Sequence, residues 1–447
     1  MKILLTVHQF FPQYTSGTEV LTCSVARELI ARGHEVHVLT GYPSGQALKD
    51  EDRFDEYEYE GIHVYRFHHA YTPMAGQTSM IAIGYDNRLA ADYFGKILQG
   101  YQPDVVHFFH LNRLGTGLIE RAVLAGIPAF MTPTDFWAIC PTGQLVLGDG
   151  SLCRGPGAYA GNCVKHFAGS TQKGLTGILA KWLPTPLAGL LARLTQADVL
   201  PPYPYQIEVK AIASRLNINV ARMNLLNKII SPNRFMTEML IQHGILSDHI
   251  VGSSFGIDMN GQQQAKLHRS SRRPFRAGYI GTLAAHKGCH ILIEACKALP
   301  VDEVILKIYG STEDFPEYSN ELKKLAAHQG NIEFCGVFHN SVIAEVMAGI
   351  DVLVVPSLWF ENTPLVIYSA QAAGCPVVGS DFPGISEVIR DEENGLLFEA
   401  GNVAALSGQL SRLIGEHGLA QRLSANSWRP ESTTSYVDEL LAVWKAA

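Results

Sequence analysis

The chain has 447 residues, of which 47% are hydrophobic and 17% charged, so it is long enough for two or three domains with cores of their own. Its formal net charge of −7 argues against an extended basic surface, and therefore against a nucleic-acid partner. Eight scattered cysteines in a chain of this size are typical of reduced thiols, which predicts a cytoplasmic protein. The first apolar run is too short for a signal peptide, and no stretch approaches the ~20 apolar residues of a transmembrane helix.

The first part of the chain alternates between strand and helix patterns. Residues 2–7 predict a buried strand, residues 18–31 have apolar positions at helical spacing, and residues 36–40 predict the next buried strand. This order predicts a parallel, doubly wound sheet. Residues 43–60 are polar and acidic, which predicts a solvated loop. The alternation then continues with strands at 62–66, 104–108 and 127–131 and helices at 87–99 and 116–125.

A loop follows the strand that ends at Met131. It contains Thr134 and Asp135. Because ligands bind at the carboxyl ends of strands in such sheets, we expect these two residues at a binding site.

Residues 138–226 break the alternation and predict an irregular insertion. Cys140, Cys153, Cys163 and His166 lie there, the last two spaced as Cys-x-x-His. A structural zinc ion held by three cysteines and one histidine would fold such a segment. A loop with free thiols and an incidental histidine is the alternative.

Residues 174–193 are apolar, carry Lys181 and Arg193, and are broken by Pro184 and Pro186. They are too short to span a bilayer. One interpretation is peripheral membrane association, with helices lying on the inner face of the membrane or near a lipid acceptor. The other is that they are core helices of the first domain.

Residues 256–274 are polar and predict a linker between a first domain, 1–255, and a second domain, 275–430. A last helix within 431–447 is expected to pack back on the first domain. The sequence thus predicts an α/β protein with two Rossmann-like, doubly wound domains that face each other across a cleft. In the second domain, strands are predicted at 276–282, 303–309, 332–335, 351–355, 376–379 and 395–398, and helices at 288–299, 317–328, 341–348, 364–373, 384–390 and 402–415, with 433–446 as the last helix.

Residues 351–380 predict a strand, a loop, a helix and another strand. Thr363 is expected to cap a helix that begins at Pro364, and Glu361 lies in the loop just before it. Free N–H groups at a helix start attract anions. We therefore expect a ligand whose phosphate lies there and whose neutral part contacts the carboxylate.

Two further positions suggest phosphate contacts. Lys287 follows the first strand of the second domain and could neutralise a diphosphate, while Gly288 lets the backbone come close. Gly17 precedes the first helix and offers another anion-binding helix start. No G-x-G-x-x-G follows the first strand and no G-x-x-x-x-G-K-[ST] occurs, which argues against dinucleotide and P-loop sites.

At these residues the chain resembles the retaining glycosyltransferases of family four, which have the GT-B fold. The resemblance covers nearly the whole chain, and its motifs are specific in this order and spacing. They are Gly17-Thr18-Glu19 with Arg32-Gly33-His34-Glu35-Val36, Gly256-Ile257-Asp258, Gly281 with Lys287-Gly288, Pro356-Ser357 with Glu361-Asn362-Thr363-Pro364-Leu365-Val366, Ala373-Gly374-Cys375-Pro376-Val377-Val378, and Asn394-Gly395-Leu396-Leu397.

The resemblance implies transfer of a hexose from a UDP-, GDP- or ADP-sugar to a glycan or lipid-linked acceptor, with retention at the anomeric carbon and no metal ion. Lys287 would stabilise the leaving diphosphate, Glu361 would hydrogen-bond the donor sugar, and Asp135 and Thr134 would lie on the acceptor side. Gly17 would let its loop close on the diphosphate. The other donor-binding positions would be Thr282, Asn362, Thr363, Pro364, Leu365, Val366 and Ser369, with the amides of Thr363 to Val366 holding phosphate.

Three positions depart from the family pattern. Ser369 stands where a second glutamate is usual, Thr282 where an arginine is usual, and Thr134 where a histidine is usual. Each lost charged hydrogen bond costs roughly 1.5–3 kcal/mol. The alternative function is therefore a catalytically weak or silent sugar-nucleotide-binding subunit that regulates a partner, but the intact Lys287 and Glu361 favour an enzyme.

Overall fold

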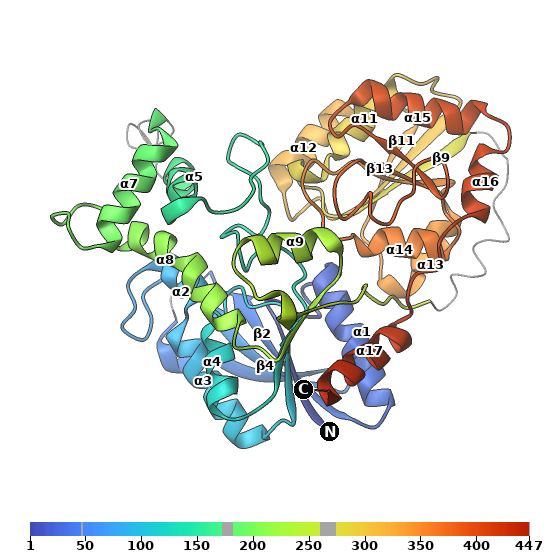
Figure 1. Cartoon of the computed structure of the whole chain (residues 1–447). Coiled ribbons are helices and arrows are strands. Elements are labelled where there is room, and N and C mark those ends of the chain that lie inside the picture. Colours follow the sequence, from blue (N-terminus) through green and yellow to red (C-terminus); the bar gives the residue numbers. More distant parts are fainter. Residues whose placement is uncertain (46–47, 172–181, 260–273, 447) are drawn as a thin grey trace. The chain divides into compact units, whose positions relative to one another are not determined.

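The computed structural model describes residues 1–45, 48–171, 182–259 and 274–446. Most of the predicted linker, and residues 174–181 of the apolar segment, lie outside the described residues. The chain forms two compact units, Met1–Ser253 with Val437–Ala447, and Ser254–Tyr436 (Figure 1). Each unit is an α/β structure built on a sheet of its own, as the sequence predicts.

The N-terminal unit contains an eight-stranded sheet in the order β3-β4-β2-β1-β5-β6-β7-β8. Its strands pair in parallel except at the edge, where β3 is antiparallel to β4. The central strand β1 is buried along almost its whole length, as its apolar sequence requires. The strands are β1 (Lys2–Val7), β2 (Glu35–Pro43), β3 (Phe54–Tyr59), β4 (Ile62–His69), β5 (Val105–Phe108), β6 (Ala129–Met131), β7 (Lys228–Ser231) and β8 (Ile250–Gly252).

Strand β3 corrects the predicted loop at 43–60. Its residues alternate between half-buried and exposed, because one side of this edge strand faces solvent. Asp55 on β3 accepts two hydrogen bonds from the guanidinium of Arg66 on β4, at 2.7 and 2.5 Å. An edge strand can carry this much charge, and charged side chains discourage pairing with other chains.

Helices cover the sheet, and more helices fill the segment that the sequence predicts to be irregular. Within 138–226 the structure has α5, α7 and α8, which pack on one another around a small core. The helices of this unit are α1 (Gly17–Ala31), α2 (Met80–Tyr85), α3 (Arg88–Tyr101), α4 (Gly117–Leu124), α5 (Gly161–Thr171), α7 (Thr185–Gln196), α8 (Gln206–Met223), α9 (Arg234–Gln242) and the end of α17 (Thr433–Lys445).

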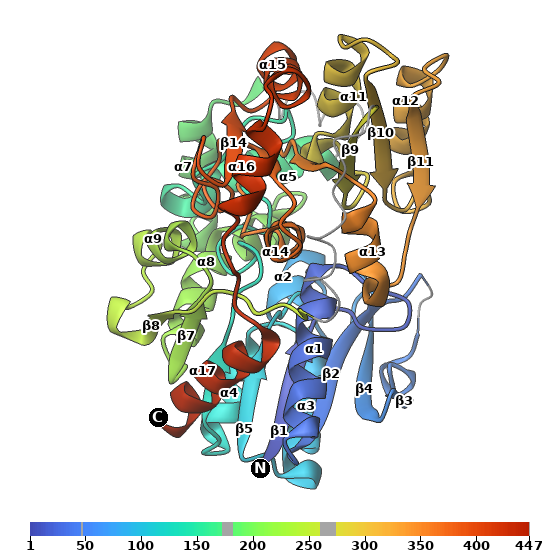
Figure 2. The same cartoon turned by 90° about the vertical axis from the view of Figure 1, so that its right-hand side faces the viewer.

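The C-terminal unit has a six-stranded, wholly parallel sheet in the order β11-β10-β9-β12-β13-β14. Figure 2 shows β9, β10 and β11 side by side, with α11 and α12 beside them. The strands are β9 (Phe275–Ile280), β10 (Val304–Tyr309), β11 (Ile332–Gly336), β12 (Val352–Val355), β13 (Val377–Ser380) and β14 (Gly395–Phe398), and the helices are α11 (Cys289–Lys297), α12 (Pro316–Leu325), α13 (Ile343–Ala348), α14 (Leu365–Ala372), α15 (Val403–Gly415) and α16 (Leu419–Ala425).

Residues 384–390 form turns rather than the predicted helix. Gly384 has a φ of +82°, a left-handed conformation that a helix cannot contain. The backbone N–H groups of Ile385 and Ser386 both donate to the carbonyl of Phe382, at 3.0 and 2.9 Å. The helical spacing of the apolar residues here reflects tight turns that bury Ile385 and Ile389.

Helix α17 contributes residues from Val437 onward to the N-terminal unit. The indole Nε1 of Trp444 donates to Nδ1 of His107 on β5 at 3.2 Å, and both side chains are buried. Among the helices in the described part of the chain, none combines the length and the apolar character that crossing a bilayer requires.

Candidate functional site

Each sheet has one point where its strand order reverses direction. In the C-terminal unit this point lies between β9 and β12, because the chain continues outward from each of them to opposite edges. In the N-terminal unit it lies between β1 and β5. Ligands of parallel α/β sheets bind outside the carboxyl ends of the strands at such points. The loops that follow β9 and β12 carry Lys287 and Glu361, and those that follow β1 and β5 carry His8 and His110.

The structure brings Lys287 and Glu361 together at the first of these points. Nζ of Lys287, after β9, lies 2.7 Å from Oε1 of Glu361, after β12. The hydroxyl of Ser357 and the indole N–H of Trp359 donate to the same oxygen, at 2.6 and 2.7 Å. The ammonium also lies 4.7 Å from the centroid of the Trp359 ring, within cation–π range. These contacts compensate for the burial of a carboxylate that is only 5% exposed.

This environment keeps the site charged. Burial by itself would raise the pKa of Glu361, but the charge of Lys287 and the hydrogen bonds from Lys287, Ser357 and Trp359 hold its pKa below the ordinary value. Burial, and then the charge of Lys287, lower the pKa of the neighbouring His286 to about 4. At neutral pH Glu361 is therefore a carboxylate and His286 an uncharged imidazole.

Two glycines allow the loops of this site to approach each other. A Cβ atom on Gly288, whose φ is +71°, would lie 1.9 Å from the carbonyl oxygen of Pro356. A Cβ on Gly384 would lie 1.9 Å from the carbonyl oxygen of Glu361. The sequence identifies Gly288 as a close-approach position but not Gly384, whose signal is the turn dipeptide that it forms with Pro383.

The helix after Glu361 begins one residue later than predicted. Pro364 has an extended backbone and is the N-cap of α14, with no side-chain capping bond, so Thr363 is not the cap. Thr363 instead has a positive φ of 51°, which turns the chain into the helix. Since proline has no N–H, only Thr363, Leu365 and Val366 can contribute amides at the predicted phosphate position. Asn362 and Thr363 are both buried.

The two departures in this unit lie on the same elements. Thr282 follows β9, and its carbonyl accepts a hydrogen bond from the hydroxyl of Tyr279 at 2.7 Å. Ser369 lies in the second turn of α14, where it is buried. The donor contacts expected of these two positions stay predictions.

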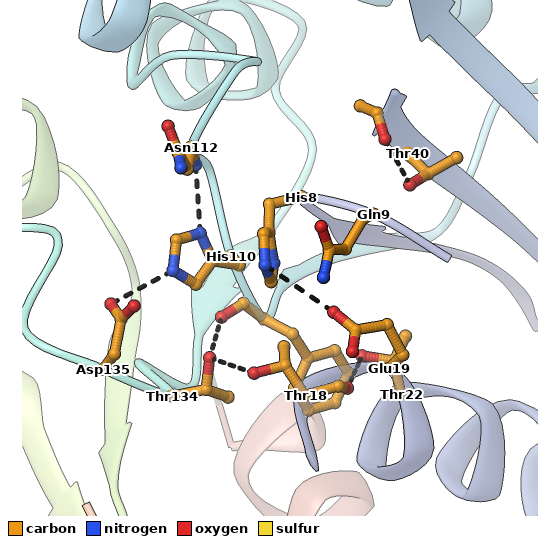
Figure 3. Close-up of polar contacts among 12 residues, drawn as sticks. His8, Gln9, Thr18, Glu19, Thr22, Thr40, His110, Asn112, Thr134 and Asp135 are labelled. Atoms are coloured by element: carbon orange, nitrogen blue, oxygen red, sulfur yellow. Dashed lines mark hydrogen bonds and ion pairs between the residues drawn. The ribbon is translucent and has the colours of Figure 1, made fainter. Parts of the chain in front are cut away.

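The N-terminal unit gathers a second set of polar side chains at its own reversal point (Figure 3). His8 follows β1, and its Nε2 lies 3.6 Å from Oε1 of Glu19 in the first turn of α1. His110 follows β5, and its ring lies 4.2 Å from that of His8. Nε2 of His110 lies 3.0 Å from Oδ1 of Asp135, which also accepts the N–H of Trp137 at 2.7 Å.

Proton positions follow from these contacts. The N–H of Asn112 donates to Nδ1 of His110 at 3.0 Å, so a neutral His110 carries its proton on Nε2, facing Asp135. Burial raises the pKa of Glu19 to about 7, opposed by weaker hydrogen bonds and by His110. Burial, then the charges of His110 and Arg113, lower the pKa of His8 well below its ordinary value. This cluster can therefore exchange a proton near neutral pH at Glu19.

The remaining predicted residues of this unit lie beside the cluster. The Thr18 hydroxyl donates to that of Thr134 at 2.9 Å, which fixes Thr134 on the amino end of α1 (Figure 3). Gly17 is the first residue of α1 and is exposed. His8, Glu19 and His110 were not predicted as site residues, although each directly follows a buried strand or opens the first helix.

The four residues of the predicted zinc site line one small pocket, of about 10 Å³, between the 140–156 loop and α5. Cys140 and Cys163 are buried, and Cys153 and His166 are partly buried. As they are placed, however, no group of three or more His, Cys, Asp or Glu side chains within the described ranges could hold a metal ion. The structural zinc stays a prediction that this geometry does not support.

Two families match the two parts of the chain. Residues 16–161 match the glycosyl transferase 4-like domain, and residues 262–428 match the glycosyl transferases group 1. A D-inositol 3-phosphate glycosyltransferase from Xylanimonas cellulosilytica is 32% identical over 153 residues, which are 33% of this chain and 36% of that protein. The amylovoran biosynthesis glycosyltransferase AmsK from Erwinia amylovora is 28% identical over 201 residues, 42% of this chain and 47% of that protein. The matched region thus spans less than half of these relatives.

The structure is similar over its whole length to solved glycosyltransferase structures. The crystal structure of Anabaena Alr3699/HepE in complex with UDP and glucose has a TM-score of 0.66 and 17% identity, with 100% of both chains covered. Sucrose-phosphate synthase from Thermosynechococcus elongatus has a TM-score of 0.61 and 15% identity, with 100% of this chain and 96% of that chain covered. These likenesses show the fold, GT-B, as predicted. The two family matches show that the chain contains a glycosyl transferase 4-like domain and a glycosyl transferases group 1 domain.

Proposed function

We propose that this protein transfers a sugar from a nucleoside diphosphate sugar to a hydroxyl group of a glycan or lipid-linked acceptor, with retention at the anomeric carbon and without a metal ion. The observation that carries the proposal is the pair formed by the partly buried Lys287 and the buried Glu361 beside the amino end of α14. A cation, a carboxylate and the backbone amides at the start of α14 meet there at the reversal point of a parallel sheet.

The chemistry of transfer needs positive charge where the diphosphate leaves. The bond between the anomeric carbon and the phosphate oxygen breaks, and the diphosphate keeps the electron pair. An ammonium group has three N–H donors, and the contact with Glu361 uses one of them. Lys287 and the amides at the start of α14 would then stabilise the developing negative charge in place of a metal ion.

Glu361 would bind the sugar rather than the phosphate. A carboxylate accepts hydrogen bonds from sugar hydroxyls and repels phosphate oxygens. Its low pKa and its fixed position between Lys287, Ser357 and Trp359 suit it to orient the sugar ring.

The polar cluster of the N-terminal unit is assigned to the acceptor. His110 and Asp135 present a hydrogen-bonding edge, and Glu19 is poised to take up or release a proton near neutral pH. The new bond forms between the acceptor oxygen and the anomeric carbon, and the hydroxyl proton leaves with the diphosphate or through this cluster.

UDP is the first nucleotide to test. The similar structure of Anabaena Alr3699/HepE was solved with UDP and glucose, and with UDP-glucose. GDP and ADP sugars belong in the same screen, because Ser369 and Thr282 replace residues that would contact the nucleotide. The relatives include an amylovoran biosynthesis glycosyltransferase and a lipopolysaccharide core biosynthesis glycosyltransferase, which supports a glycan or lipid-linked acceptor.

A thermal-shift and calorimetric screen against UDP, GDP, ADP and their sugar conjugates, without added metal, tests the donor site. A ligand that binds the folded state raises the melting temperature by mass action. Turnover with the sugar of the winning nucleotide follows, and Lys287→Ala and Glu361→Ala should each lower kcat/KM by about 10²–10³. Lys297→Ala is the matched control, because Lys297 forms an exposed pair with Glu294 on α11 of the same unit.

The outcomes separate the two functions. Nucleotide binding without hydrolysis or transfer would favour the silent, regulatory subunit. Unchanged turnover in both Lys287→Ala and Glu361→Ala would overturn the assignment of the site. Loss of turnover in Lys297→Ala would show that the effect comes from the fold rather than from the site.

A further inference from the structure

The helical lobe formed by η2 (Ala158–Ala160), α5 and α7 has an unusual charge for this chain. From Gly150 to Ala197 the sequence contains five Lys or Arg residues and no Asp or Glu, in a chain whose net charge is −7. The five are Arg154, Lys165, Lys173, Lys181 and Arg193. A contiguous basic segment in an acidic protein is an electrostatic signal for an anionic partner.

Helix α7 exposes two of its four leucines, keeps Leu191 and Leu194 partly buried, and buries only smaller residues. Its buried positions are Ala188, Ala192 and Thr195, whereas Leu187 and Leu190 are 52% and 49% exposed. A helix that only packs against its own protein would turn the leucines inward. This pattern indicates that the leucine face, formed by Leu187 and Leu190, contacts an apolar partner outside this unit.

Further exposed side chains extend this face. Leu187, Leu190 and Arg193 follow one another at three-residue spacing, so they share one stripe of the helix. The guanidinium of Arg193 lies 5.4 Å from the centroid of the Tyr159 ring, which is itself 44% exposed. Trp182, shortly before α7, is 82% exposed. The face thus combines leucine, aromatic and arginine side chains.

The lobe is also held in place. Its helices pack on α8 around buried Cys163, Ala192 and Ile212. In Figure 1, α5 and α7 lie beyond α2 and α8, away from the sheet of the N-terminal unit. The leucine face is therefore presented by a folded element and is not covered by the described part of this unit.

We propose that this lobe binds the anionic surface of a lipid bilayer. Trp182, Leu187 and Leu190 would enter the headgroup region, and Arg193 would contact anionic headgroups. An amphipathic helix with exposed leucines, basic neighbours and modest overall hydrophobicity lies in the membrane interface, where an exposed tryptophan such as Trp182 is also favoured. A protein partner would explain the leucines, but a bilayer explains the leucines, the tryptophan and the absence of any acidic residue together.

Vesicle co-sedimentation tests the proposal. The full chain should sediment with phosphatidylcholine vesicles that contain phosphatidylglycerol, much less with phosphatidylcholine alone, and less at high salt because the charges are screened. Leu187→Ser with Leu190→Ser, and separately Arg193→Glu, should each lower the partition coefficient by about tenfold. The matched control is Val123→Ser with Leu124→Ser, two exposed apolar residues on α4 of the same unit. Melting temperature and nucleotide binding should not change in any of these variants.

Depth-dependent quenching gives a second readout. Brominated lipids should quench tryptophan emission of the wild type and of Trp428→Phe, but not of Trp182→Phe; Trp428 is an exposed tryptophan of the other unit. No sedimentation with anionic vesicles would overturn the proposal. So would equal quenching in both tryptophan variants, or self-association that disappears in the leucine variant, which would assign the face to a protein contact.

Discussion

Lys287 and Glu361 stabilise each other inside a largely buried site, so their removal should affect stability as well as turnover. Lys287→Met leaves a buried carboxylate with one charged partner fewer, which should lower the free energy of unfolding by about 3–5 kcal/mol at neutral pH. The double variant with Glu361→Gln should recover part of this loss. Urea unfolding of the wild type, both single variants and the double variant measures the coupling.

The pH dependence of stability tests the same interaction, because it follows from the pKa of Glu361. The folded state holds the pKa of Glu361 below its ordinary value, so its contribution to stability is present above about pH 4.5 and is lost as pH falls through the folded pKa. In Lys287→Met, burial should raise that pKa instead. Additive effects of the two substitutions, with no change in pH profile, would contradict the pairing.

Glu19 should show the opposite pH dependence. Its folded pKa of about 7 lies above the ordinary value of 4.5, so stability falls as pH rises between these values, by about 3 kcal/mol in all. Glu19→Gln should remove this slope. Urea unfolding at pH 5 and pH 8 measures it as the difference between wild type and variant, in which the titration of the neighbouring His8 cancels. Identical slopes in both proteins would show that Glu19 is ionised throughout.

At the scale of elements, the site depends on two turns, at Gly288 and Gly384, that tolerate only glycine. Gly384→Ala places a Cβ 1.9 Å from the carbonyl oxygen of Glu361, so the loop must move and nucleotide binding should weaken at least tenfold. Gly418→Ala is the matched control, because Gly418 has nearly the same φ, +83°, but no atom within 4 Å of the added Cβ. It should cost only about 1–2 kcal/mol of stability. Equal nucleotide affinity in both variants would contradict the role of the close contact.

The zinc site predicted for the cysteine segment before and within α5 can be tested by direct metal analysis. Metal content of the chelator-washed protein tests it, with Cys163→Ser as the variant. Stoichiometric zinc that is lost in Cys163→Ser would establish a structural site. Less than stoichiometric zinc in a folded protein would leave the apolar pocket around Cys140 and Cys163 as ordinary packing.

Sequence patterns predict those elements whose structure is determined by residues that are close together in the sequence. Strands such as β1 and β12 are buried on both faces and are therefore continuous apolar runs, and helices such as α11 follow a clear helical period. They failed where an edge or a turn decides the structure. The charged strand β3 is stable because β4 pairs with it, and residues 384–390 turn because Gly384 is left-handed.

The same limit applied to the site. Lys287 and Glu361 were predicted because each stands in a strand-to-helix loop, but their contact, and the donors Ser357 and Trp359, depend on the order of β9 and β12 in the sheet. His8 and His110 lie 102 residues apart in the sequence and meet only because β1 pairs with β5. Such pairings are long-range and leave no local pattern.

At the scale of the whole molecule, the C-terminal unit is one continuous stretch, Ser254–Tyr436, whereas the N-terminal unit needs the last residues of the chain. Trp444 packs on His107 and Phe130 and donates to Nδ1 of His107, which leaves Nε2 of His107 to donate to Thr132 at 2.9 Å. Burial lowers the pKa of His107 to about 3, so this imidazole stays neutral and depends on both partners.

Trp444→Ala should therefore destabilise one unit only. The lost packing and the unpaired Nδ1 atom should cost the N-terminal unit about 3–5 kcal/mol. Hydrogen exchange should rise in peptides from β1 and β5 and stay unchanged in β9 and β12, and nucleotide binding should persist. Trp428→Ala, at a half-exposed tryptophan of the C-terminal unit, is the control and should change neither set. Faster exchange in both sheets of Trp444→Ala would mean that the two units unfold together, because a single cooperative transition spreads any local loss over the whole chain.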